Sequence, residues 1–269
     1  MVENIVSKRN NVNVIGQGKQ VMLFAHGFGC DQRAWKFIVD AFTADYKLVL
    51  FDYTGSGQSD ISQYNPQKYS SLEGYAEDVK EICEALQLKD VIFIGHSVSS
   101  MIGLLAAIKN PEYFSKLVFI GPSPRYINTP DYYGGFDQSD LENMFELMDN
   151  NYMGWSSAMA PVIMGNAERP ELGEFLTDSF CSTDPDVARD FARVTFFSDN
   201  RDDLSKLNVK SLTLQCSEDI IASFEVGTYV SENIPGNEFV LLKATGHCPH
   251  ISEPAETIKA IKTFLKTMN

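Results

Sequence analysis

The chain has 269 residues, of which 44% are hydrophobic and 22% charged, and its formal net charge is −14. This length and composition are those of an ordinary globular protein with one large core. An acidic surface repels phosphate backbones and anionic membranes, and the densest basic group is only the pair Lys8-Arg9. The composition therefore argues against nucleic acid or a membrane as the main partner.

The N-terminal residues and the cysteines bear on the compartment. MVENIVSKRNNVNVIG lacks the apolar core of a signal peptide, and no later apolar stretch approaches the roughly 20 residues of a membrane-spanning helix. The five cysteines form no CxxC pair, which favours a reduced, cytoplasmic protein over a disulfide framework. His247, Cys248 and His250 lie close in sequence, but structural zinc needs four ligands, so we expect neither a metal nor another cofactor.

Short β-rich runs alternate with helical patterns along the chain. The runs are NVNVIG (11–16), QVMLFAH (20–26), YKLVLFD (46–52), DVIFIG (90–95), KLVFIG (116–121), SLTLQC (211–216) and EFVLLK (238–243). Several are apolar throughout, as are strands of a parallel sheet that is covered on both faces. Residues 71–88 and 256–268 have the periodicity of amphipathic helices. The alternation predicts an α/β fold with a mostly parallel sheet flanked by helices.

One stretch, residues 125–203, carries no strand pattern. It contains helix-like pieces rich in Met and aromatic residues, separated by prolines and a Gly-Gly pair. A bare loop of that length is uncommon inside a compact domain. We therefore expect a helical lid over the carboxyl edge of the sheet, where open α/β sheets bind ligands. Residues 1–124 and 204–269 would form the core of the same structural domain.

Ser97 follows the fourth β-rich run, in VIFIGHSVSSMIG, and precedes a helical pattern. A serine on such a sharp strand-to-helix turn exposes its hydroxyl above the sheet and can act as a nucleophile. The alternative is a plain turn in which the serine caps the helix. Ser99 departs from the G-x-S-x-G motif by one hydroxymethyl group, which we expect the turn to tolerate.

A serine nucleophile needs a base, and the chain has four histidines. His26 lies after the second run, and His96 is adjacent to Ser97. In this type of fold the base comes from the loop after the last strand, where ATGHCPHISEP holds His247 and His250. His247 is the preferred base because it directly follows the last strand and Gly246, and His250 is the alternative.

The imidazole in turn needs a carboxylate that orients it and stabilises its cation. Glu218 and Asp219 follow the sixth run, at the carboxyl edge, and Asp219 is the preferred partner. Asp52 and Asp60 in FDYTGSGQSD are alternatives, but they break the chain order of serine, acid and histidine.

Acyl transfer also needs donors for the developing oxyanion. The motif HGFG after the second run places the backbone N–H of Phe28 at the sheet edge, and Val98 directly follows the candidate nucleophile. We expect these two N–H groups to form the oxyanion hole.

Aromatic and apolar residues are available to line a substrate pocket. A pocket of this kind suits a small hydrophobic ligand. The alternative is that these side chains only pack the lid on the sheet. The candidates are Phe136, Trp155, Met159, Phe196 and Phe197 from the lid stretch and Cys248 beside the candidate base, with Phe28 flanking the site.

Six phrases together carry a resemblance to a known family. They are HGFGCDQRAW, FDYTGSGQSD, GHSVSSMIG, PSPRYINTPDYYGGF, FCSTDPDVARDFARVTFFSDNRDDL and GHCPH. They resemble the α/β-hydrolases of the RsbQ type, which regulate the bacterial sigma-B stress response, and the related plant karrikin and strigolactone receptors. The likeness covers essentially the whole chain, lid included. The plant receptors share the GHSVS elbow, so Ser99 departs from the broad hydrolase pattern but not from this subgroup.

The resemblance implies an α/β-hydrolase fold with a four-helix lid inserted after the sixth strand, above a deep apolar pocket that contains the serine. The triad Ser97, Asp219 and His247 and the donors Phe28 and Val98 carry over to matching positions. Slow hydrolysis of a small hydrophobic ester or lactone, of the butenolide kind, is implied, with signalling through a protein partner. In the bacterial case that partner is a PAS-domain phosphatase, RsbP. We expect a monomer or a weak homodimer.

Two other functions stay open at this point. The protein could be a metabolic carboxylesterase without a protein partner, or a ligand-binding receptor whose triad is idle. An intact triad argues against the idle receptor, but it does not separate a sensor from an esterase.

Overall fold

The β-rich runs form one sheet in the computed structural model, which describes residues 2–266. The strand order is β1-β3-β2-β4-β5-β6-β7, and every neighbouring pair is parallel except β1 with β3. This confirms the predicted α/β-hydrolase architecture. The strands are β1 (Asn13–Ile15), β2 (Gln20–Ala25), β3 (Tyr46–Leu50), β4 (Val91–His96), β5 (Phe114–Ile120), β6 (Lys210–Glu218) and β7 (Glu238–Thr245).

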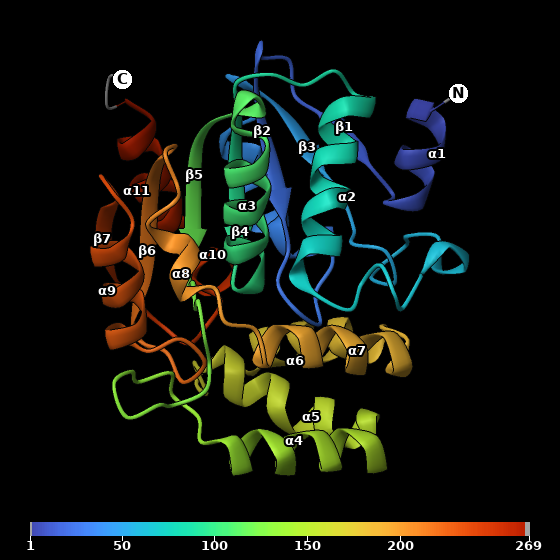
Figure 1. Ribbon diagram of the computed structural model, residues 1–269, viewed down its shortest axis with the longest axis vertical. Helices are drawn as coiled ribbons and strands as arrows, with labels where there is room; N and C mark the ends of the chain where they lie inside the picture. The colour runs from blue at the N-terminus through green and yellow to red at the C-terminus, as the bar shows by residue number, and fades with distance from the viewer. Residues whose placement is uncertain (1, 267–269) are drawn as a thin grey trace.

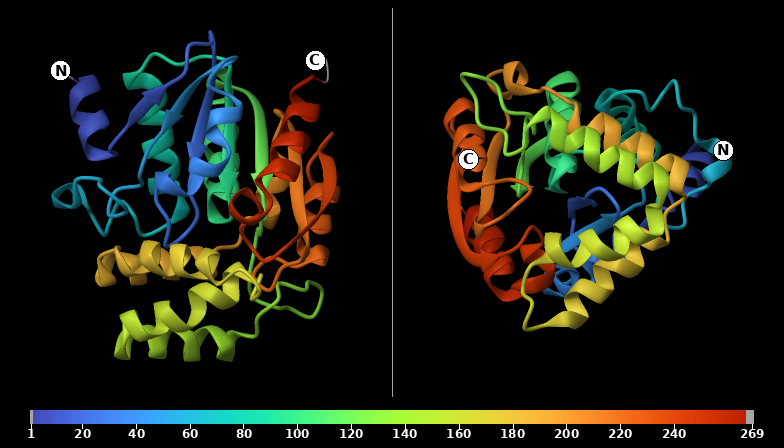
Figure 2. Two further views of the ribbon diagram at one scale, coloured as in Figure 1. Left: turned by 180° about the vertical axis from the view of Figure 1, so that it is seen from behind. Right: turned by 90° about the horizontal axis from the view of Figure 1, so that it is seen from below.

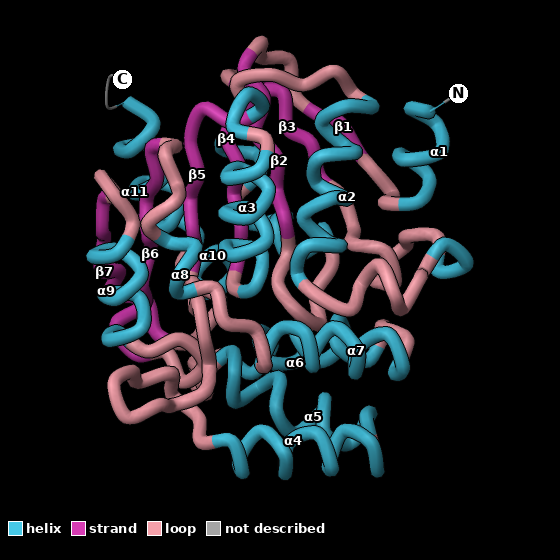
Figure 3. Tube along the Cα trace, viewed as in Figure 1, coloured by secondary structure: helices cyan, strands magenta, loops and turns pink. Residues whose placement is uncertain are grey.

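Helices cover both faces of the sheet (Figure 3). Val21 and Leu23 of β2 enter one core, and the intervening Met22 enters the other, because successive strand side chains point to opposite faces. The first face is covered by α2 (Leu72–Ala85), α3 (Val98–Lys109), α8 (Arg201–Leu204) and α9 (Phe224–Asn233). The second is covered by α11 (Pro254–Lys266) and the 3₁₀ turns of residues 32–41. The apolar strands of the sequence are thus buried on both sides.

Four further helices form a lid below the carboxyl ends of the parallel strands (Figure 1). Helix α4 lies beside α7, and α5 lies beside α6, as the view from below also shows (Figure 2). The helices are α4 (Gln138–Asn150), α5 (Tyr152–Met164), α6 (Pro170–Cys181) and α7 (Pro185–Phe196), and a short helix, α10 (Pro249–Ser252), follows β7. All four lid helices fall within the predicted stretch 125–203, although the division into core and lid stays a prediction.

The place of the lid in the strand order differs from the expectation. The expected insertion after the sixth strand is wrong, because the lid follows the fifth, β5. The segment ahead of β1 forms the helix α1 (Val2–Arg9). Arg9 forms ion pairs with Asp78 and Glu81 of α2, which hold this segment against a helix rather than against the sheet.

Asp78 is a buried carboxylate that ties several loops to α2. Its side chain is fully buried, and it pairs with Arg9 at 3.2 Å and with Lys68 at 2.7 Å. The hydroxyl groups of Tyr69 and Thr54 donate to it at 2.9 and 3.1 Å. Two cations and two hydroxyls thus compensate the buried charge of Asp78, which has lost its contact with water.

Among the described residues, every helix is too short or too polar to cross a lipid bilayer.

We predict that Asp78→Asn lowers the free energy of unfolding by roughly 2–3 kcal/mol, because Arg9 and Lys68 lose the fully buried one of their two carboxylate partners and keep only Glu81. Urea unfolding followed by circular dichroism measures the change. Glu77→Gln is the matched control, since Glu77 is half exposed and pairs with Lys80 within the same helix, and it should cost about 0.5 kcal/mol. Equal unfolding midpoints for the two variants would contradict the role of Asp78.

Candidate active site

Ser97 occupies the tight turn between β4 and α3. Its φ of 56° and ψ of −124° lie in a region that residues with a side chain rarely adopt. The backbone N–H of Ser97 donates to the Ile120 carbonyl of β5 at 2.8 Å, which holds the strained turn against the neighbouring strand. Backbone strain that is maintained by surrounding structure is typical of functional sites, and this strand–turn–helix setting is that of a nucleophile elbow.

The side chains of Ser97, His247 and Asp219 form one hydrogen-bonded chain. The Ser97 Oγ lies 2.7 Å from His247 Nε2, and His247 Nδ1 lies 2.7 Å from Asp219 Oδ2. The other carboxylate oxygen of Asp219 accepts from the backbone N–H groups of Ile221 and Ala222 at 2.8 and 3.1 Å. Asp219 is thereby oriented so that Nδ1 of the imidazole carries the proton and Nε2 can receive one from the serine.

Two neighbours make room for His247 and hold its loop. Gly121 directly follows β5 and has a φ of 58°. A Cβ at this position would lie 3.2 Å from the His247 ring and 3.5 Å from the Asp219 carboxylate, and glycine leaves this space free. The backbone N–H of His247 donates to the Ile163 carbonyl of lid helix α5 at 3.0 Å. The imidazole is therefore positioned by the sheet on one side and by the lid on the other.

His250, the alternative base, lies apart from the triad chain. Its ring packs 4.6 Å from that of Trp35 and 4.5 Å from that of His96, and neither ring nitrogen has a hydrogen-bond partner among the described residues. Burial, with a smaller contribution from the neighbouring His247, lowers the pKa of His250 to about 3. His250 is therefore a neutral, packed side chain at physiological pH.

The remaining alternatives also have other contacts. His96 Nε2 lies 2.9 Å from the backbone carbonyl of His247, and burial, with the neighbouring imidazoles, keeps the pKa of His96 well below its usual range. Asp52 accepts hydrogen bonds from the Asn11 side chain and from the backbone N–H groups of Gln32 and Gln58. Asp60 accepts from Ser62, and Glu218 is exposed. In the described part of the chain, His247 is hydrogen-bonded to Asp219 and to none of these acids.

The HGFG loop passes directly against the nucleophile. A Cβ on Gly27 would lie 2.5 Å from His96 Nδ1 and 3.3 Å from Ser97 Cβ, so only glycine permits this approach. Phe28 follows at once, and Val98 is the first residue of α3, where the backbone N–H has no partner within the helix. Both predicted donors thus belong to segments that adjoin Ser97, and their role in an oxyanion hole stays a prediction.

A small apolar cavity opens beside Ser97. Its volume is about 30 Å³, which is room for little more than one water molecule. A ligand larger than this enters only when side chains of the lid move. The lining residues are Phe28, Cys30, His96, Ser97, Tyr126, Ile163, Leu176, Phe180, Thr195, Phe196, Ile221, His247 and Cys248.

The predicted pocket residues separate into three groups. Phe196 and Cys248 line the cavity. Phe136, Trp155 and Met159 do not line it but pack behind it in the lid core, where the Trp155 ring stacks 6.0 Å from that of Phe180 and the Phe136 ring lies 6.1 Å from that of Phe196.

Phe197 was predicted to line the pocket, but it does not line the cavity. Its side chain is 42% exposed and stacks on Phe145 outside the cavity. Phe196 is the last residue of α7 and Phe197 follows it, so the two side chains point in different directions and only that of Phe196 faces the triad. The sequence alone did not reveal which one, because both are apolar.

Sequence reasoning missed other lining residues, notably Tyr126. Its ring is buried beside Ser97, its hydroxyl has no well-oriented partner among the described residues, and burial raises its pKa. The available signal was its position shortly after β5, at the carboxyl edge of the sheet. Cys30 was also missed, and burial raises the pKa of its thiol to about 12.

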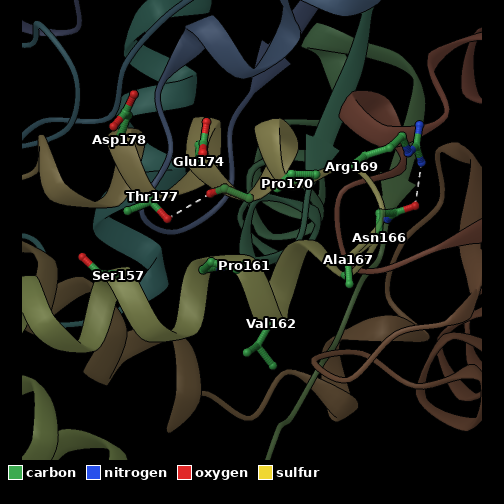
Figure 4. A pocket seen from close by; sticks show the side chains of 12 residues that line it. Ser157, Pro161, Val162, Asn166, Ala167, Arg169, Pro170, Glu174, Thr177 and Asp178 are labelled. Atoms are coloured by element: carbon green, nitrogen blue, oxygen red, sulfur yellow. Dashed lines mark hydrogen bonds between the residues drawn. The ribbon is translucent and has the colours of Figure 1, made fainter.

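A larger hollow than this cavity lies elsewhere. A groove of about 670 Å³ runs along the outside of α5 and α6, lined in part by Pro161, Arg169 and Glu174 (Figure 4). None of the residues that line this groove belongs to the triad, and the size of a groove is not by itself evidence of a catalytic site. No group of three or more His, Cys, Asp or Glu residues in the described chain is arranged to hold a metal ion.

Comparison with known proteins places this geometry in a family. Residues 20–254 match the model of the alpha/beta hydrolase fold. The chain is 39% identical to a karrikin insensitive 2 receptor of Petunia hybrida, over 96% of each chain. It is 35% identical to the strigolactone esterase D14 of Arabidopsis thaliana, over 98% of this chain and 99% of that one.

A solved structure has the same fold over nearly the full length. A hydrolase from Oleispira antarctica superimposes with a TM-score of 0.96 at 44% identity, covering 98% of each chain. The elbow at Ser97, the strand order and these relatives agree, and the chain belongs to the α/β-hydrolase family.

Proposed function

We propose that this protein is a serine hydrolase that slowly cleaves a small apolar ester or lactone and acts as a ligand sensor. The observation that carries the proposal is the hydrogen-bonded chain from Ser97 through His247 to Asp219, which opens on an apolar cavity. The relatives support it in part, because some are named esterases and others receptors.

In the proposed reaction, Ser97 Oγ attacks the carbonyl carbon of the ester while His247 Nε2 takes the serine proton. Asp219 stabilises the imidazolium that forms. The oxyanion accepts hydrogen bonds from the N–H groups of Phe28 and Val98. The C–O bond then breaks, and the alcohol leaves with the proton from His247. Water, deprotonated by the same imidazole, hydrolyses the acyl-serine and restores the enzyme.

Slow turnover is proposed because the site is closed. The cavity holds little more than one water molecule, and aromatic side chains of α6 and α7 wall it on the lid side. Substrate entry and product release therefore require the lid to move, and such steps limit the rate of many enzymes. The apolar walls favour a small hydrophobic substrate, since they offer few polar groups to bind a charged one.

Two other functions compete with this proposal. A metabolic carboxylesterase would use the same triad and differ only in having no protein partner. A receptor with an idle triad would bind without turnover, but hydrogen bonds of 2.7 Å on both sides of His247 favour chemistry.

We predict that Ser97→Ala lowers kcat for p-nitrophenyl acetate at least about a thousand-fold and abolishes labelling by a fluorophosphonate, because both reactions need the Ser97 oxygen. His247→Ala should be nearly as damaging, since triad members act as a unit. Initial rates and mass spectrometry of the labelled protein measure the effects. Wild-type rates in Ser97→Ala would overturn the assignment of the nucleophile.

His250→Phe is the control for this prediction. Phenylalanine preserves the ring that packs on Trp35, and no hydrogen bond of the described residues is lost because neither His250 nitrogen has a partner. The variant should retain activity within about threefold. Loss of activity in His250→Phe, with retention in His247→Ala, would move the base to His250.

The neighbouring pair Phe196 and Phe197 allows a matched test of the cavity. Phe196→Ala should enlarge the cavity and raise kcat/KM for p-nitrophenyl hexanoate relative to acetate by about tenfold. Phe197→Ala should leave that ratio unchanged, because the ring lies outside. Equal ratios for both variants and the wild type would show that the substrate binds elsewhere.

We further propose that signalling uses a protein partner, a PAS-domain phosphatase of the RsbP type. The support is the resemblance of the lid phrases to the RsbQ type and the relatives that are named receptors. A purified phosphatase of this type should bind the chain at low micromolar concentration in isothermal titration calorimetry. Ester turnover without any such binding would favour the metabolic carboxylesterase.

A further inference from the structure

Ser99 lies where the G-x-S-x-G motif has its last glycine, and the reaction described above does not use it. It is the second residue of α3, and its side chain is fully buried. Tyr53, which follows β3, is also fully buried and lies beside it, with its hydroxyl 2.9 Å from Ser99 Oγ. Two buried hydroxyl groups thus meet next to the HGFG loop.

The donors and acceptors in this contact can be assigned. Ser99 Oγ donates to the backbone carbonyl of His26 at 2.5 Å, and a carbonyl oxygen can only accept. The single hydrogen of the Ser99 hydroxyl is therefore committed to His26. The hydrogen between the two hydroxyls must then come from Tyr53, which donates to Ser99 Oγ.

A second set of hydrogen bonds holds the His26 side chain. The backbone N–H of Tyr53 donates to His26 Nε2 at 3.1 Å, so Nε2 is the unprotonated nitrogen. Nδ1 carries the proton and donates to the Gly27 carbonyl at 2.9 Å. The carbonyl and the ring of His26 are thus tied to Ser99 and Tyr53, one residue before Gly27 and two before Phe28.

We infer that Ser99, supported by Tyr53, is a positioning residue for the oxyanion loop. The inference rests on the proposed function, in which the Phe28 N–H binds the oxyanion. Glycine or alanine at position 99 would leave the buried His26 carbonyl without its donor, and the loop would then be free to shift relative to Ser97. Donors of an oxyanion hole stabilise the transition state only when they are already in place, so a small shift lowers kcat.

The test is the variant Ser99→Ala, compared with Ser100→Ala. Ser100 is a suitable control because it is the next residue of the same helix, is fully buried, and donates to the Gly95 carbonyl at 3.2 Å, away from the HGFG loop. We expect Ser99→Ala to lower kcat for p-nitrophenyl acetate by about 10- to 100-fold, with KM within about twofold. Ser100→Ala should keep the wild-type kcat.

An inhibitor that mimics the tetrahedral intermediate separates positioning from a general loss of structure. A trifluoromethyl ketone adds to Ser97 and places an oxyanion in the hole, so its inhibition constant should rise in Ser99→Ala by the same factor by which kcat/KM falls. Tyr53→Phe should act in the same direction. The double variant should be no worse than Ser99→Ala, because both side chains act through one hydrogen-bonded chain.

Each outcome bears on the inference. A Ser99→Ala protein that melts at a lower temperature but keeps kcat and inhibitor affinity would overturn it, because the hydroxyl would then be only structural. If ester turnover is too slow to measure, the rate of fluorophosphonate labelling replaces kcat, since phosphonylation also places an oxygen in the hole. The proposed function is judged separately, on the wild type and Ser97→Ala, so a failure of one is distinct from a failure of the other.

Discussion

The hydrogen-bonded chain through His247 is the constraint on which the arrangement of the molecule depends. Its three members follow the ends of β4, β6 and β7. Both hydrogen bonds are 2.7 Å long, so the three side chains must be placed accurately, although Ser97 and His247 are 150 residues apart in sequence. Parallel pairing of β4 through β7 brings these strand ends to one edge. β5 lies between β4 and β6, and its Ile120 carbonyl holds the Ser97 turn. Gly121, which follows β5, leaves room for the His247 ring.

The lid is part of this constraint rather than a separate cover. Ile163 of α5 accepts the backbone hydrogen bond of His247, and Asn166, just after α5, donates to the carbonyl of Thr245 at the end of β7. Glycines on the sheet side let the lid approach closely, since a Cβ on Gly29 would overlap the Phe180 ring of α6. Closing the cavity and positioning the His247 loop are therefore coupled in one packed unit, which supports the proposal that lid motion limits turnover.

Ser99 illustrates how a departure from a motif can be compensated. A glycine at this position would only allow close packing, but close packing is maintained here by Gly95, whose Cβ would lie 2.7 Å from the Ser99 carbonyl. The extra hydroxyl is fully hydrogen-bonded, to His26 and Tyr53, so its burial leaves no polar group without a partner.

The sequence by itself determined the strands, the nucleophile turn and the order of serine, acid and histidine, because these depend on local apolar runs and on chain order. It also identified the lid stretch, since a compact domain rarely holds residues 125–203 as a loop without secondary structure of its own. It did not determine whether Phe196 or Phe197 faces the cavity, or that Tyr126 lies beside Ser97. Only the tertiary structure decided these, because they depend on helix rotation and on contacts between segments far apart in the chain, which no local pattern records.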